Sequence, residues 1–280
     1  MATAPPTPAQ SPPPGVTSNF DNPETLVDKN NIAMGVSIPL ITIFFFLRVY
    51  VRLYIRQAWI FEDWLVLTAW ASTISLAGVG AATMAHSGGR HAWDITEKQF
   101  QQALYWFNVT SINYGIAICI TKLSVLAYYR RVFSPFRQRP FDLSIVCLII
   151  VLILFYVSTT IVKIWECMPR ATIWDKSIPG TCINTSILLD TSGLFNTVTD
   201  VIMLLLPVKA VWSLKLKFKQ KVLVVGVFTF GLCAPAFSLV GCIVRLQGDD
   251  NPDKSWVQPM IIMWGLYDSK FLFTPSSIPP

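Results

Sequence analysis

Seven runs of apolar residues follow the first thirty positions of the chain, and short polar connections separate them. The runs cover residues 32–51, 64–84, 103–129, 143–162, 187–207, 222–244 and 256–273. Each is close to the length of about 20 residues that an α-helix needs to cross the hydrocarbon core of a bilayer. The runs are too long, and alternate too little, to be strands of a membrane barrel. The pattern therefore predicts an all-α membrane protein, a bundle of seven transmembrane helices within residues 31–275.

The two ends of the chain differ from this pattern. Residues 1–30 are rich in Pro, Thr, Ser and Ala and contain no apolar run, so we expect a disordered tail there. The seventh run contains Asp268 and Lys270 and leads into a proline-containing segment with a short tail at 276–280. We therefore expect the seventh helix to be atypical or truncated.

Composition excludes several classes of soluble protein. Hydrophobic residues make up 53% of the 280 residues and charged residues 14%, against about 25% in soluble domains. Such a chain is not an ordinary cytosolic enzyme or a disordered protein. The net charge of +6 does not indicate nucleic-acid binding, because the basic residues lie between the apolar runs rather than on one polar face. We expect an integral, multi-pass protein of the plasma membrane or an endomembrane.

The distribution of basic residues predicts the orientation of the bundle. If the seven runs cross the membrane in turn, thirteen Lys and Arg residues lie on one side and eight on the other. Because the richer side of a membrane protein usually faces the cytosol, the N-terminal tail is predicted outside and the C-terminus in the cytosol.

Two cysteines and a glycosylation sequence lie in the connection between the fourth and fifth runs. Cys167 and Cys182 flank this connection, which faces the oxidising side of the membrane on the predicted topology, so we expect a disulfide between them. Asn184 begins an Asn-Thr-Ser sequence and is a candidate for N-glycosylation.

Three charged residues lie inside the third and fifth apolar runs, where a charge is costly and normally pairs within the bundle. These are Lys122 in the third run and Asp190 and Asp200 in the fifth. Lys122 precedes Arg130 by eight residues and Asp200 precedes Lys209 by nine. Both therefore lie about 12–13 Å from the cytosolic edge, at roughly 1.5 Å per helical residue. We predict a buried Lys122–Asp200 ion pair; the alternative is that Lys122 extends to the lipid headgroups.

Small and polar residues in these two runs fall on one side of each helix, because a helix turns by about 100° per residue. The arc on the third run contains Asn108, Ser111, Gly115, Cys119 and Lys122, and the arc on the fifth contains Ser186, Asp190, Gly193, Asn196, Thr197 and Asp200. Such arcs either pack helices together or line a ligand cavity, and both interpretations fit the pattern. Asp190 and Arg245 would lie near the outer mouth of a cavity.

Charged residues also gather at the cytosolic ends of the runs. They include Arg48, Arg52, Glu62, Asp63 and Arg130. We expect ion pairs among them and contacts with anionic lipid. The segment 215–221 alternates basic with other residues, which favours either lipid contact or a cytosolic partner such as a G protein.

No motif predicts catalysis or a cofactor. The sequence contains no phosphate-binding glycine loop, nucleophile elbow or zinc signature. His86 and His91 flank a Gly-containing connection, which we interpret as a solvated turn rather than a metal site. No catalytic residue, metal or cofactor is therefore assigned.

The order and spacing of several motifs resemble the fungal "rhodopsin domain" integral membrane proteins over about residues 30–268. The motifs are Arg48-Val-Tyr-Val-Arg52, Glu62-Asp-Trp64, the stretch from Lys122 to Arg130, Cys167-Met-Pro169 with Cys182, and Asn196, Asp200 and Pro207. The resemblance implies a seven-helix membrane protein. Most members of that group have no assigned activity, some are proposed receptors, and others belong to secondary-metabolite gene clusters. Residues 270–280 depart from the family pattern, which continues the seventh helix into a longer tail.

Together these features predict a non-enzymatic protein of receptor-like architecture that senses a small lipophilic ligand. The ligand would enter from the outer side between the third, fifth and sixth helices. The alternative is a membrane accessory protein, or a cyclase-like, non-redox enzyme, of secondary metabolism, in which Asp190 or Asp200 would protonate the substrate. Expected partners are membrane lipids, the lipophilic ligand and a cytosolic signalling protein, and not nucleic acid.

Overall fold

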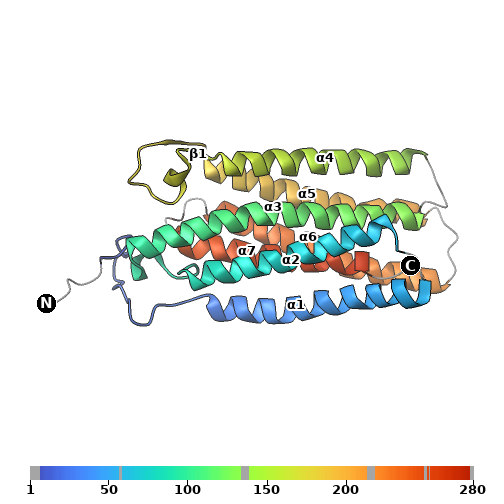
Figure 1. Cartoon of the computed structure of the whole chain (residues 1–280), viewed down its shortest axis with the longest axis horizontal. Coiled ribbons are helices and arrows are strands. Elements are labelled where there is room, and N and C mark those ends of the chain that lie inside the picture. Colours follow the sequence, from blue (N-terminus) through green and yellow to red (C-terminus); the bar gives the residue numbers. More distant parts are fainter. Residues whose placement is uncertain are drawn as a thin grey trace.

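Seven long α-helices run side by side in the computed structural model (Figure 1). The structure describes residues 7–56, 59–133, 139–212, 218–248, 251 and 253–277. The helices are α1 (Val27–Tyr50), α2 (Phe61–Ala85), α3 (Glu97–Phe133), α4 (Arg139–Ile164), α5 (Thr185–Trp212), α6 (Phe218–Gly248) and α7 (Lys254–Ser277). The predicted all-α bundle is thereby confirmed.

Most helices extend beyond the apolar runs of the sequence. Each run lies within one helix, except that Val51 begins a π-helical turn, η1 (Val51–Arg56), which continues α1. The extensions are polar, as at Glu97 and Lys98 in the first turn of α3. Hydrogen bonding within a helix does not require apolar side chains. A helix can therefore continue beyond the apolar part that would cross the hydrocarbon core. Within the described part of the chain, five helices, α1 to α5, are long and apolar enough to cross a membrane.

Helix α7 packs against four other helices, α1, α2, α3 and α6. Its buried side chains include the polar Asp268 and Ser269 beside Ile262 and Leu266. By contrast, large apolar side chains remain exposed on α1 and α4, as Leu154 does at 65% of its surface. A helix surrounded by other helices does not need to be apolar all round. This explains the irregular seventh run. Residues 278–280, which follow α7, lie outside the described part.

The connection between α4 and α5 folds into a small closed unit at one end of the bundle. It contains strands β1 (Cys167–Met168) and β2 (Thr181–Cys182), which pair antiparallel, and the short helix η4 (Arg170–Ile173). A disulfide joins Cys167 to Cys182, as predicted. Figure 1 shows the N-terminal segment at the same end of the molecule. We call this end the disulfide end and the other the opposite end.

The N-terminal segment differs from the disordered tail expected over residues 1–30. Residues 27–30 belong to α1, and Leu26 is 1% exposed against Met84 and Met263. The Leu26 N–H donates to the Gly89 carbonyl, and the Gly89 N–H donates to the Ser255 carbonyl. Gly89 has φ +78°, and a Cβ there would lie 3.1 Å from Leu26 Cβ, so a glycine fits this junction. Long-range contacts, which composition does not reveal, hold the segment.

The connection between α2 and α3 is also less solvated than predicted. The His91 ring is stacked between the rings of Trp93 and Trp256, at centroid distances of 4.4 and 4.0 Å. Its Nδ1 lies 2.5 Å from Asp253 Oδ2. The interpretation as a solvated turn is therefore wrong for His91, because residues more than 160 positions later cover it. His86 stacks on Trp106.

Candidate functional site

A network of polar side chains crosses the middle of the bundle. Lys122 on α3 places its Nζ 2.9 Å from Asp200 Oδ1 on α5, and both side chains are fully buried. Lys122 Nζ also donates to Thr199 Oγ1 at 2.6 Å and to the Asn196 carbonyl at 3.0 Å. The structure thus brings together the two residues whose depths match in the sequence, and Lys122 does not extend to the headgroups.

Asn196 connects this ion pair to three further helices. Its Nδ2 lies 2.7 Å from Ser238 Oγ on α6 and 2.8 Å from Asp268 Oδ2 on α7. Its Oδ1 accepts a bond of 3.0 Å from the Tyr156 hydroxyl on α4. We call Lys122, Tyr156, Asn196, Thr199, Asp200, Ser238 and Asp268 the polar core. Sequence reasoning noted Asp268 as a charge in an apolar run but did not place it with Asn196, because its depth in an irregular run could not be counted.

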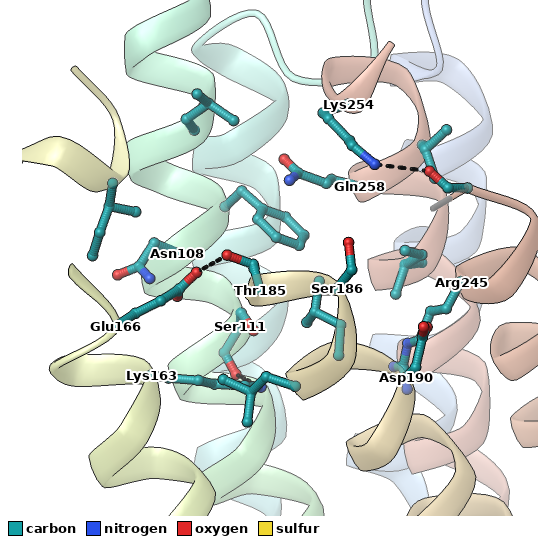
Figure 2. Close-up of a pocket in the computed structure, with 18 of the residues that line it drawn as sticks. Asn108, Ser111, Lys163, Glu166, Thr185, Ser186, Asp190, Arg245, Lys254 and Gln258 are labelled. Carbon is teal, nitrogen blue, oxygen red and sulfur yellow. Dashed lines mark hydrogen bonds between the residues drawn. The ribbon is translucent and has the colours of Figure 1, made fainter. Parts of the chain in front are cut away.

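A separate pocket lies near the disulfide end, with a volume of about 290 Å³. Residues of α3, α4, α5, α6, α7 and the loop between α4 and α5 line it (Figure 2). Asp190 and Arg245 belong to this lining, whereas Lys122, Asn196 and Asp200 do not. These five residues, which the sequence analysis placed inside the bundle, are therefore divided between the pocket and the polar core.

The two interpretations of the polar arcs apply at different depths. Asn108 and Ser111 on α3 and Ser186 on α5 line the pocket. Deeper along the same helices, Lys122 and Asn196 join helices to one another. A helix face of one character can therefore serve as a cavity wall in one turn and as a packing surface in a later one.

Basic residues outnumber acidic ones around the pocket. The basic residues are Lys163, Lys176, Arg245 and Lys254, and the acidic ones are Glu166 and Asp190. Glu166 accepts a hydrogen bond from the Thr185 hydroxyl, and Lys254 donates to the Gly248 carbonyl (Figure 2). Sequence reasoning missed Lys163 and Glu166, because both follow the end of the fourth apolar run and their burial depends on other segments that pack against them.

At the opposite end, two arginines converge on one carboxylate. Arg48 Nη2 lies 2.8 Å and Arg52 Nε 3.1 Å from Asp63 Oδ1, and all three side chains are buried. Asp63 Oδ2 also accepts the Ile60 N–H at the start of α2. The predicted ion pairs between the first helix and the first connection are therefore present for these residues.

The remaining charges of this end pair differently. Glu62 lies 3.3 Å from Arg131 Nη1, and Arg130 Nε lies 2.7 Å from Asp142 Oδ1 on α4. The Arg130 pair is half exposed, so it contributes about 1 kcal/mol or less to stability. The basic segment 215–221 falls outside the residues whose side chains are described.

Comparison with known proteins identifies the family. The model of the "Fungal rhodopsin domain" matches residues 47–280, which is most of the chain. The chain belongs to the fungal rhodopsin domain family. The residues of the polar core and of the pocket lie within the matched range.

Several curated proteins are similar in sequence to this fungal rhodopsin domain protein. A "SAT4 family membrane protein" of Emericella nidulans is 32% identical over 61% of this chain and 45% of its own length. "Fugralins biosynthesis cluster protein 2" of Gibberella zeae is 27% identical over 92% of this chain and 65% of its own. "Polyenoic acids biosynthesis gene cluster protein Ba17b" of Metarhizium anisopliae is 27% identical over 75% of this chain and 58% of its own. The chain spans about half to two thirds of the length of these relatives. No solved structure matches the chain significantly.

The glycosylation candidate of this family member has a structural role at the disulfide end. Asn184 Oδ1 accepts the Ser186 N–H at 3.1 Å and so caps the first turn of α5. Its side chain is exposed, and the amide nitrogen that a glycan would use is not the atom that caps the helix. No group of three His, Cys, Asp or Glu side chains that could hold a metal ion occurs in the described ranges.

Proposed function

We propose that this protein binds a small ligand with an apolar body and a polar head in the pocket near the disulfide end. The observation that carries the proposal is the pocket itself. It has a volume of about 290 Å³ and is lined by five helices and the disulfide-closed loop. Small-molecule sites are typically concave and apolar with a few convergent polar groups, and they often lie between the helices of a bundle. Lipid-facing packing alone would leave no reason for charged residues such as Asp190 and Arg245 at this depth.

The orientation of the bundle forms part of the proposal. We place the disulfide end and the N-terminus outside the cytosol and the C-terminus inside it. The Cys167–Cys182 disulfide supports this placement, because disulfides persist in oxidising compartments. The larger number of basic residues at the opposite end supports it as well. The ligand would then enter from the outer side, and the Arg130 end would face a cytosolic partner.

The names of the relatives support a place in secondary metabolism. Two of them are named as proteins of biosynthesis clusters, for fugralins and for polyenoic acids. We propose that the ligand is a product or intermediate of such a pathway and that the protein senses it.

The geometry also favours one version of the enzymatic alternative over the other. A proton donor must reach its substrate, and Asp190 lines the pocket whereas Asp200 is sealed in the polar core. An accessory enzyme of cyclase type would therefore use Asp190.

Complementation of a gene deletion tests the proposal. We expect Ser186→Phe, which fills the pocket, to fail to restore the wild-type metabolite profile or response at equal abundance. Ser158→Phe makes the same change on an exposed position of α4 and should restore it. Equal complementation by both variants would contradict the proposed pocket.

The same strains separate sensing from enzymatic action. Loss of one metabolite with accumulation of its precursor, reproduced by Asp190→Asn, would support the enzyme. An altered response with all metabolites still formed would support sensing.

A further inference from the structure

The charges that line the pocket near the disulfide end are unbalanced. Four basic residues and two acidic ones line it, so the lining carries a net positive charge. A cation that is removed from water needs a counter-charge or a full set of hydrogen-bond acceptors. A lining of net positive charge favours a ligand that brings negative charge.

Lys163 is the first of two basic residues at the inner end of the pocket. It lies in the last turn of α4 and is 6% exposed. Within the described part of the chain, its Nζ donates to the Ser111 carbonyl at 3.3 Å, a long bond to a neutral acceptor. An ammonium group has three protons to donate, so Lys163 retains donor capacity toward the pocket.

Arg245 approaches the inner end of the pocket from the other side, beside Asp190 (Figure 2). It is 9% exposed, and its buried Nε has no hydrogen-bond partner among the described residues. The guanidinium carbon lies 5.7 Å from the centre of the Tyr114 ring. A Cβ at Gly193 would lie 2.6 Å from Arg245 Nη1, so the glycine gives the guanidinium its space.

The rest of the wall suits an apolar body. Phe100, Leu104 and Phe107 of α3 line the pocket, and Leu188 and Ile261 line it from α5 and α7. The exposed lining is more apolar than polar, so an ion without an apolar part would leave most of the wall unused. A ligand with one charged head and a hydrocarbon body would satisfy both parts.

We propose that the pocket binds a small amphipathic carboxylic acid, with its carboxylate between Lys163 and Arg245 and its apolar chain along the α3 wall. This inference rests on the proposed function, because it names the chemical class of the ligand of that same pocket. A carboxylate would accept bonds from the ammonium of Lys163 and from the unpartnered Nε of Arg245, and charge-assisted bonds of this kind are the strong ones.

Thermal unfolding of the full chain in phosphatidylcholine nanodiscs tests the class of head group, because this lipid carries no net negative charge. The probes are decanoic acid, methyl decanoate and decan-1-amine, which share one chain. We expect the acid alone to raise the unfolding temperature, by about 2–4 °C at concentrations well above Kd. An equal rise with the ester or the amine, or no rise with the acid, would overturn the carboxylate assignment.

Variants locate the binding. Lys163→Gln and Arg245→Gln should each abolish the rise with decanoic acid, and Lys163→Arg, which keeps the charge, should retain it. Arg170→Gln is the control. It removes an exposed basic residue of the loop between α4 and α5 that does not line the pocket, and this variant should respond as the wild type does. A rise that persists in both Gln variants, or that is lost in Arg170→Gln, would contradict the proposed site.

The outcomes separate this inference from the proposed function. If the ester or the amine stabilises the protein, the pocket binds ligands but not as a carboxylate site. If Ser186→Phe complements fully, the proposed function fails irrespective of the head group.

Discussion

At the scale of single residues, the polar core contains two carboxyl groups but one ammonium group. Lys122 pairs with Asp200, whereas Asp268 reaches the same network through Asn196. Asp268 Oδ1 has no hydrogen-bond partner among the described residues. The two carboxyl groups are therefore not equivalent: one neutralises a buried ammonium and the other is an excess buried acid.

This difference predicts opposite effects of two matched substitutions. Asp200→Asn leaves the Lys122 ammonium buried without a counter-charge and should lower stability by about 3–5 kcal/mol. Asp268→Asn keeps a partner for Asn196 and removes the excess acid, so stability should be unchanged or higher. Thermal unfolding of the purified variants measures both. Equal losses for the two variants would show that the core does not depend on this pairing.

At the scale of elements, Asp63 joins α1 and η1 to the start of α2. Arg48 and Arg52 reach it from successive turns, and the Ile60 N–H bonds its second oxygen. A helix at the edge of a membrane bundle gains little from hydrophobic burial, since lipid is as apolar as its neighbours. We infer that this buried ionic contact fixes how α1 docks on α2.

Removing that contact should lower stability far more than removing a neighbouring charge. Asp63→Asn leaves two buried arginines without their carboxylate, and we expect a loss of about 3–5 kcal/mol. Glu62→Gln, whose partner Arg131 is partly exposed, is the control and should cost about 1 kcal/mol or less. Unfolding temperature and yield of monodisperse protein report the difference, and similar values for both variants would rule out the special role of Asp63.

At the scale of the whole molecule, the two ends of the bundle differ in chemistry. The disulfide end carries the closed loop, the packed N-terminal segment and the pocket. The opposite end carries the arginine–carboxylate pairs. This difference between the two ends supports the proposed topology, in which the ligand binds outside the cytosol and a signalling partner binds on the cytosolic side.

The topology predicts which parts of the chain an antibody and a glycosidase can reach from outside the cell. With the N-terminus outside, an N-terminal epitope tag on intact protoplasts or sealed, correctly oriented vesicles should be accessible to antibody, whereas a C-terminal tag should require permeabilisation. Asn184 should accept a glycan, so a glycosidase should reduce the apparent mass of the wild type but not of Asn184→Gln. Accessibility of the C-terminal tag alone would reverse the orientation.

The sequence by itself determined the helices and their order, and it predicted the Lys122–Asp200 ion pair and the Cys167–Cys182 disulfide. Apolar runs of membrane length indicate helices whatever their neighbours are, and the matched depths of Lys122 and Asp200 are counted along helices of known rise. The Cys167–Cys182 disulfide follows in the same way, because both cysteines flank one short connection on one side.

Only the tertiary structure decided which polar residues line the pocket and which seal the core. Asp190 and Asn196 lie on one face of one helix, yet one lines a cavity and the other joins five helices. The burial of Lys163, His91 and Leu26 likewise depends on segments far away in the chain. The period of a helix gives the side on which a residue lies, but its environment is set by what packs against that side, which no local pattern records.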